Sequence, residues 1–185
     1  NVAIGNALVK LLRLRQAANG LFAFGDDKTS SKLDTLEELL EKIPADAKVL
    51  VFTSFKDTAN EIKRRLGKNA EIITGDSSND ERDKAVAAFK GHKRVLIGTD
   101  AIAYGYNLQE ASYVINVDLP WSYSKYEQRY GRVWRKGQKN AVTVYNLQAA
   151  QTVDVHVAKI LQRKLKTADE VTSVTRDDLR SILGT

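Results

Sequence analysis

The sequence predicts an α/β protein in which helices cover both faces of a mostly parallel sheet. Short apolar runs rich in β-branched residues alternate with segments whose apolar residues recur at helical spacing. Strands and helices that alternate in this way indicate βαβ units. Because ligands of such sheets bind beyond the carboxyl ends of the strands, the residues that follow each strand are the first place to look for function.

The expected elements follow one another along most of the chain. Apolar, β-branched runs predict strands at residues 48–55, 71–74, 94–98, 112–117 and 141–147. Apolar residues at helical spacing predict helices at residues 7–18, 31–43, 57–66, 78–89, 124–135 and 153–165. We therefore divide the chain into an N-terminal helix and linker (1–30), an α/β domain (31–166), and a C-terminal loop and short helix (167–185).

Local signals support two of these helix starts. The segments that begin at Ser31 and Ser78 have an acidic residue three positions later, Asp34 and Glu81, and so resemble capping boxes. Both helices are therefore expected to begin next to these serines.

The composition narrows the class of protein. Among 185 residues, 29 Lys and Arg face 23 Asp and Glu, and the net charge of +6 suggests a polyanionic partner. The absence of Cys excludes disulfides, thiolate metal sites and Cys nucleophiles, and with only two His we expect no metal site. In the basic helix at 7–18, Lys10, Arg13 and Arg15 are expected to be solvated, with contact to DNA as the alternative.

No apolar run approaches the ~20 residues that a membrane helix needs. The N-terminal residues do not resemble a signal peptide, so we expect an intracellular protein, in cytoplasm or nucleus. Because residue 1 is Asn and not Met, we expect the chain to be a piece of a longer protein.

Small polar residues lie at the carboxyl ends of three of the predicted strands. Thr53 and Ser54 lie at the end of the first, Thr74 and Gly75 at the end of the second, and Thr99 directly after the third. Their hydroxyl and backbone N–H groups could bind phosphate oxygens, although Thr and Ser at such places are also common turn formers and helix caps. Because three such sites occur at successive strand ends of a basic protein, we retain two interpretations: phosphate binding, and a local role as turn formers or helix caps.

The most informative segment is residues 126–138. On one continuous helix, Gln128, Arg132 and Arg135 would share a face, and Gly131 would allow close backbone approach between them. Two Arg one turn apart suit a triphosphate, because guanidinium groups form bidentate pairs with phosphate oxygens. A solvated cationic helix face is the plainer alternative.

Four segments, in this order, resemble the second RecA-like lobe of helicase superfamily two. They read VLVFTSF (49–55), IITGDSSNDERDKAVAAF (72–89), VLIGTDAIAYGYNLQEASYVINVDLPWS (95–122) and YEQRYGRVWRKGQ (126–138). Within them, TDAIAYGYNL resembles helicase motif V and QRYGRVWR resembles motif VI. The resemblance covers about residues 11–161 and implies a RecA-like three-layer α/β/α fold.

Three details point to one branch of that superfamily. Gly137-Gln138 after motif VI, the DLPW sequence at 118–121 and the LLRLRQAANG segment at 11–20 resemble the Swi/Snf-type DNA-dependent ATPases. Ile102-Ala103 departs from the Gly-Gly pair that is usual there. Double-stranded DNA and the N-terminal RecA-like lobe of the same protein are therefore the expected partners.

The resemblance implies that this lobe completes an ATP site. Arg132 and Arg135 would be arginine fingers that stabilise charge in phosphoryl transfer. Gln128 would stand beside them and help order the site, and Gly105 and Asn107 would lie at the nucleotide edge of motif V.

The resemblance also implies a nucleic-acid surface. The backbone of the nucleic acid would be contacted by Thr53, Ser54, Thr74, Gly75 and Thr99, with Arg82 supporting that surface. Contacts of this kind go to phosphate and sugar and read little sequence.

The chain has no Walker-type phosphate loop. Gly67-Lys68 lacks the Gly upstream and the Ser or Thr that should follow, and no acidic strand end suits Mg²⁺. We therefore expect ATP with Mg²⁺ to be held mainly by the other lobe, and the isolated chain to be inactive.

Several alternatives stay open from the sequence. The chain could belong to another superfamily-two DNA or RNA helicase, or be a nucleic-acid-binding module without catalysis. Asp100 could orient motif V or cap the turn that follows it. Trp134 could stack on a base, or pack within the protein.

Overall fold

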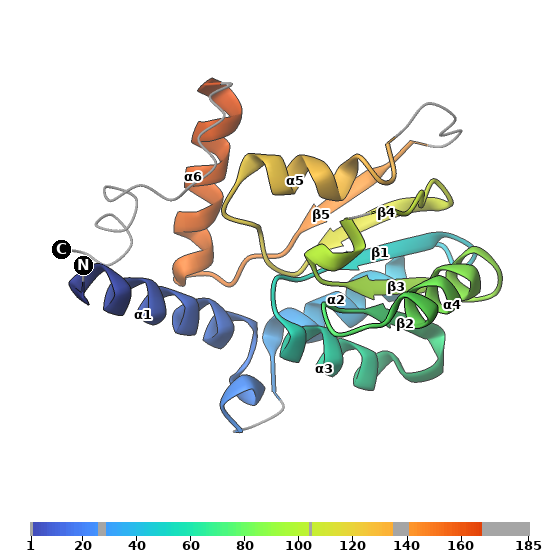
Figure 1. Cartoon of the computed structure of the whole chain (residues 1–185), viewed down its shortest axis with the longest axis horizontal. Helices are drawn as coiled ribbons and strands as arrows, with labels where there is room; N and C mark the ends of the chain where they lie inside the picture. The colour runs from blue at the N-terminus through green and yellow to red at the C-terminus, as the bar shows by residue number, and fades with distance from the viewer. Residues whose placement is uncertain (1, 26–28, 104, 135–140, 168–185) are drawn as a thin grey trace.

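A computed structural model describes residues 2–25, 29–103, 105–134 and 141–167. Its centre is one parallel sheet in the order β2-β3-β1-β4-β5 (Figure 1). The strands are β1 Lys48–Phe52, β2 Ala70–Ile73, β3 Val95–Gly98, β4 Ala111–Asn116 and β5 Thr143–Asn146. The α-helices are α1 Val2–Asn19, α2 Ser31–Lys42, α3 Lys56–Leu66, α4 Asn79–Lys90, α5 Tyr123–Tyr130 and α6 Val153–Thr167. The predicted fold is confirmed.

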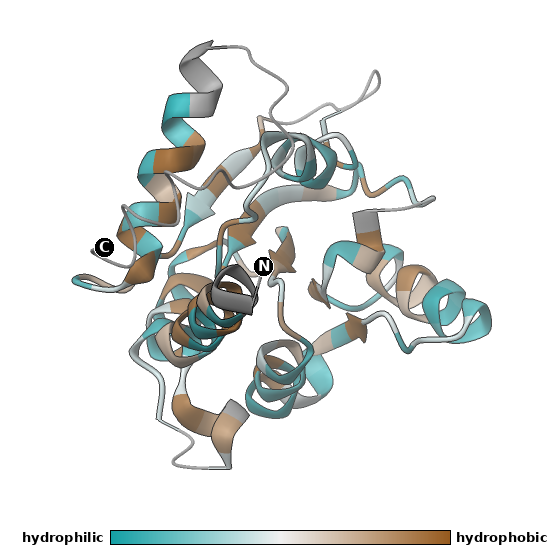
Figure 2. Ribbon diagram, turned by 60° about the vertical axis from the view of Figure 1, so that its left-hand side comes forward, coloured by the Kyte–Doolittle hydropathy of each residue, from teal (hydrophilic) through white to brown (hydrophobic). Residues whose placement is uncertain are grey.

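The alternation of side chains along the central strand separates two cores. Val49 and Val51 pack on one face against α2 and α3, whereas Leu50 and Phe52 pack on the other against α4. All four are fully buried, as expected for a strand covered on both sides. Figure 2 shows helices that carry both apolar and polar residues, which suits helices that cover a core with one face only.

A third apolar cluster joins the two ends of the described chain. Leu11 of α1 packs with Val157 and Leu161 of α6 and with Leu119, which follows β4. The N-terminal helix is therefore attached to the α/β domain through α6. None of the helices in the described ranges is long and apolar enough to cross a membrane.

The helix ends differ from prediction at two places. The side chain that caps α2 is that of Ser30, not Ser31; its hydroxyl accepts a hydrogen bond from the Leu33 amide at 3.2 Å. The capping box between Ser78 and Glu81 is confirmed at the start of α4. The helix predicted at 124–135 ends at Tyr130, which matters for the site described below.

The residue that departs from the Gly-Gly pattern packs over a glycine. Ile102 lies in the 3₁₀ helix η3, Asp100–Ala103, and is fully buried in the core on the α4 face. Its Cγ1 and Cδ1 atoms occupy the space that a Cβ at Gly98 would need. Gly98 thus leaves room for Ile102, and the two positions should depend on one another.

We expect this dependence to appear in a double-mutant cycle. Gly98→Ala should destabilise the chain by about 1–3 kcal/mol through overpacking, and Ile102→Ala by about 2–5 kcal/mol through the cavity it leaves. The added methyl group should cost much less in the double variant, because the clashing atoms are gone. Urea unfolding of the four proteins measures this; strictly additive losses would contradict the packing described.

Candidate functional site

The carboxyl ends of the strands meet at one edge of the sheet, as predicted. The amide of Thr99 donates to the carbonyl of Ile73 at 3.2 Å, and the amide of Thr53 donates to the carbonyl of Gly98 at 3.0 Å. The strand-end segments that begin at Thr53, Thr74 and Thr99 are therefore neighbours. We call this set of segments, together with Asp118 after β4, the strand-end edge.

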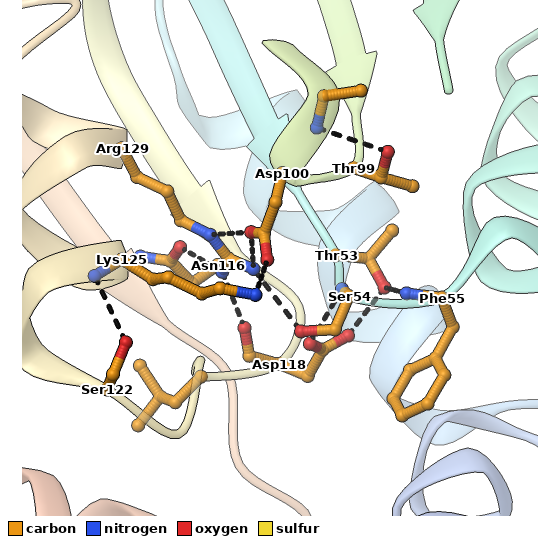
Figure 3. Close-up of polar contacts among 12 residues, drawn as sticks. Thr53, Ser54, Phe55, Thr99, Asp100, Asn116, Asp118, Ser122, Lys125 and Arg129 are labelled. Atoms are coloured by element: carbon orange, nitrogen blue, oxygen red, sulfur yellow. Dashed lines mark hydrogen bonds and ion pairs between the residues drawn. The ribbon is translucent and has the colours of Figure 1, made fainter. Parts of the chain in front are cut away.

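These residues differ in what they expose. Gly75 is exposed, and Ser54 and Thr99 are half-buried. Thr53 is fully buried, and its hydroxyl donates to Oδ2 of Asp118 at 2.5 Å (Figure 3). The Thr53 hydroxyl is therefore used in a hydrogen bond inside the protein, and the hydroxyl of the neighbouring Ser54 lies nearer the surface.

The loop after β2 is held by hydrogen bonds within the loop and by hydrogen bonds from α4. Thr74 is 6% exposed; its amide donates to the Ser77 hydroxyl at 3.0 Å. Arg82 of α4 donates from Nη2 to the carbonyls of Thr74 and Gly75, at 3.4 Å each. Arg82 therefore supports the loop that carries Gly75; its part in a nucleic-acid surface stays a prediction.

The residue that ties these loops together is Arg129, which sequence reasoning counted only as one cation of a basic helix face. It is fully buried. It donates to Asp100 Oδ1 from Nε at 3.1 Å and from Nη2 at 2.9 Å, to Asn116 Oδ1 at 2.9 Å, to the Asp118 carbonyl at 2.9 Å and to the Ser54 hydroxyl at 3.3 Å. Figure 3 shows the side chain reaching from α5 into the strand-end edge. One guanidinium thus connects three segments of the edge, which contain Ser54, Asp100 and residues 116–118.

The carboxylate of Asp100 faces two cations. Besides the contact with Arg129, it pairs with Lys125 of α5, whose Nζ lies 3.2 Å from Oδ2 (Figure 3). Of the two roles considered for Asp100, these contacts favour the one in which it orients motif V, because they join η3 to α5.

Asp118 accepts hydrogen bonds from several directions while only 1% exposed. Oδ1 accepts the Ser54 amide at 2.8 Å, and Oδ2 accepts Nδ2 of Asn19 at 2.9 Å in addition to the Thr53 hydroxyl. Burial alone would raise the pKa of this carboxyl, but Arg15, Arg129 and the hydrogen bonds from Ser54 and Thr53 outweigh it and hold the pKa below its ordinary value. Sequence reasoning did not select Asp118 as a site residue; an acidic residue directly after the apolar run VINV was the available signal.

Arg15 of α1 is not solvated, and the expectation was wrong. It is 3% exposed, donates to the Leu119 carbonyl at 2.5 Å and lies 3.5 Å from Oδ1 of Asp118. Its guanidinium lies over the rings of Phe55 and Trp121, at 5.3 and 4.7 Å from their centroids. Desolvation lowers the pKa of Arg15, and Asp118 opposes that effect. Lys10 and Arg13, by contrast, are exposed.

Motif VI is a short helix followed by a turn, not one continuous helix. The carbonyl of Tyr130 accepts the amides of both Val133 and Trp134 at 2.8 Å, which closes the turn after α5. Gln128 and Arg132 therefore do not follow one another along a single helix face. Arg135, Gly137 and Gln138 lie outside the described residues.

Arg132 is placed beside motif V through the backbone. Its carbonyl accepts the amide of Leu108 at 3.0 Å, while its half-exposed side chain has no hydrogen-bond or ion-pair partner within the described part of the chain. Gly105 and Asn107, three residues and one residue before Leu108, are both exposed. Gly105 has a φ of 93°, in the left-handed region that favours glycine.

Comparison with known proteins assigns the family. A model described as the helicase conserved C-terminal domain matches residues 31–137. The chain belongs to this family. It is 34% identical to the "Uncharacterized ATP-dependent helicase YqhH" of Bacillus subtilis (strain 168), over 83% of this chain and 28% of that protein. It is also 34% identical to the "DEAD-box ATP-dependent RNA helicase 20" of Arabidopsis thaliana, over 80% of this chain and 30% of that protein.

A solved structure agrees on the fold. The C-terminal part of the Fun30 ATPase domain superposes with a TM-score of 0.68 at 22% identity, over 81% of this chain and 48% of that one. The resemblance to the C-terminal RecA-like lobe of a superfamily-two helicase is thus confirmed. The chain spans less than a third of the length of the two curated relatives.

We expect Asp118 to dominate the acid sensitivity of this edge. Asp118→Asn should cost about 3 kcal/mol near pH 7, because it leaves Arg15 and Arg129 without that charge. Since the folded pKa is depressed, the stabilisation is present above the unfolded pKa, about 3.9, and is lost as the pH falls through the folded value. The difference between wild type and variant should therefore shrink below about pH 4.

Urea unfolding between pH 7 and pH 3 measures this effect. Asp80→Asn is the matched control, since the pair of Asp80 with Lys84 lies on the surface of α4 and should change stability little at any pH. A loss for Asp118→Asn that is the same at pH 7 and pH 3 would show that its charge does not stabilise the fold.

Proposed function

We propose that this helicase C-terminal domain is the C-terminal motor lobe of a DNA-dependent ATPase and translocase of the Swi/Snf-like branch. The observation that carries the proposal is the placement of Arg132. Its backbone is bonded to motif V, while its guanidinium has no partner among the described residues. A cation positioned in this way is suited to an anionic ligand brought by another part of the protein.

The residues fit the phosphates of ATP as that ligand. Guanidinium groups pair with phosphate oxygens in a bidentate manner, and Arg132 has the exposure to do so. Gly105 and Asn107 are exposed and shortly precede Leu108, whose amide is bonded to the Arg132 carbonyl, so we assign them to the nucleotide edge of motif V. We assign Arg132, with Arg135, to charge stabilisation in phosphoryl transfer and Gln128 to ordering of the site. Mg²⁺ and most of the nucleotide would be held by the N-terminal RecA-like lobe.

The strand-end edge supports the nucleic-acid half of the proposal. Ser54, Gly75 and Thr99 bring hydroxyl and backbone groups to adjacent strand ends, with Arg82 beneath the loop of Gly75. Groups of this kind bind phosphate and sugar without reading bases. Opening and closing of two lobes around ATP would then shift this edge along the nucleic acid, because ATP binds the closed arrangement better.

Two candidate functions differ in the nucleic acid on which the protein acts. Duplex DNA is supported by Gly137-Gln138 and the DLPW lead-in at 118–121. An RNA helicase is the second candidate, because relatives at 31–37% identity carry that name. A strand-separation assay on the two-lobe protein discriminates between them. Translocation on duplex DNA without unwinding supports the first candidate, and ATP-dependent unwinding of RNA supports the second.

We expect Arg132→Ala in the two-lobe protein to lower ATP turnover by about 10³-fold or more, as loss of an arginine finger does. Nucleic-acid affinity should stay nearly unchanged, because Arg132 is assigned to phosphates of ATP. Turnover and fluorescence-anisotropy binding measure the two effects, and Lys84→Ala on the exposed side of α4 is the control. Equal loss of both activities would mark Arg132 as a nucleic-acid contact. The 185-residue chain alone should not hydrolyse ATP.

A further inference from the structure

An aromatic groove lies on the side of α5 that faces β5. It has a volume of about 730 Å³ and is lined by Tyr123, Tyr126, Glu127, Tyr130, Gly131, Trp134, Ala141, Val142 and Val144. The lining residues of α5 are spaced i, i+3, i+4 and i+7, so they share one helix face. In Figure 1, α5 lies beside β5. Nothing in the proposed ATP and nucleic-acid contacts uses this groove.

Four of the nine lining residues are aromatic: Tyr123, Tyr126, Tyr130 and Trp134. The rings of Tyr126 and Tyr130 meet edge to face, with centroids 4.3 Å apart and planes at 75°. Trp134 is 78% exposed, the most exposed of the large apolar residues among those described. Large exposed aromatic side chains next to a hollow mark sites of interaction, because covering them with a partner removes much apolar area from water.

The charge of the groove indicates which kind of ligand it can bind. Glu127 is the only charged residue in the described lining. Its Oε1 accepts a hydrogen bond from the Tyr123 hydroxyl at 2.6 Å, which fixes one carboxylate oxygen at the aromatic wall. Ring faces carry partial negative charge and attract cations. Carboxylate and rings therefore act in the same direction, toward a cation and against a phosphate.

We propose that this groove binds a cationic side chain, best an arginine, of a partner protein. A guanidinium is planar and can stack on an aromatic ring while its N–H groups bond a carboxylate, which an ammonium does less well. The volume exceeds that of one side chain, so a short peptide segment with an arginine anchor fits the space. The proposal stands independently of the proposed motor function.

The test is an NMR titration of the ¹⁵N-labelled chain with the peptide acetyl-Gly-Arg-Gly-amide. The control peptide carries citrulline, which has the shape of arginine without its charge. We expect shifts at the Trp134 indole N–H and at amides of α5, with an affinity about tenfold above that for citrulline, equivalent to about 1.4 kcal/mol and within the range of a cation–π contact.

Variants locate the binding. Glu127→Gln and Trp134→Ala should each weaken arginine binding several-fold, whereas Glu41→Gln, an exposed change on α2, should not. Because Glu127 and Trp134 are exposed, both variants should keep the dispersed amide spectrum of the folded chain. If one variant loses that spectrum because it does not fold, the other variant and the comparison with the citrulline peptide still test the proposal.

Three results would overturn the proposal. Equal affinity for the two peptides would show that charge plays no part. Stronger shifts of the same residues by oligothymidylate would identify the groove as a base-stacking site. Arginine binding that appears only after Lys136→Gln and Lys139→Gln would show that the chain's own cations take the place of a partner.

Discussion

A buried carboxylate between two buried guanidinium groups is the interaction on which the strand-end edge depends. Asp118, Arg15 and Arg129 are at most 3% exposed, and each would cost several kcal/mol to desolvate alone. Asp118 offsets the charge of Arg15, and Asp100 pairs with Arg129. The remaining hydrogen-bonding groups of the trio bind the amide and hydroxyl of Ser54 and the carbonyls of Asp118 and Leu119. Because these hydrogen bonds are made to the backbone and side chains of the loops, the buried charged residues fix the geometry of the edge. Removal of one charge leaves its partner buried without a counter-charge.

This arrangement divides the basic residues of motif VI into two kinds. Arg129 points inward and connects loops, whereas the guanidinium of Arg132, after the end of α5, has no partner among the described residues. The same contacts bring a distant element to the site, because Arg15 joins α1 to the loop after β4. The N-terminal helix is thus a structural part of the edge. In the proposed function, this internal support would let the surface residues of the edge bind nucleotide and nucleic acid without also holding the loops in place.

Most of the fold could be predicted from the sequence, because β-branched runs and helical spacing are local signals. The gathering of Thr74 and Thr99 at one edge also followed, since parallel strands end together. The burial of Arg15 and Arg129 did not follow, because it depends on partners 104 and 75 residues away in the chain. From the sequence of a helix alone, a cationic side chain is expected to be solvated, because the residues that bury it in the folded protein come from other elements. The helix end at Tyr130 was missed because the segment keeps helical spacing, whereas the chain turns after Tyr130, whose carbonyl accepts the amides of both Val133 and Trp134.

The most direct test of this account is a double-mutant cycle between Arg15→Met and Asp118→Asn, read as free energy of unfolding at pH 7. If the buried charges support one another, the double variant should be little worse than the more harmful single variant, with a coupling of about 1.5–3 kcal/mol. Losses that add, with a coupling below about 0.5 kcal/mol, would contradict the claim that α1 and the strand-end edge are held by a shared charge network.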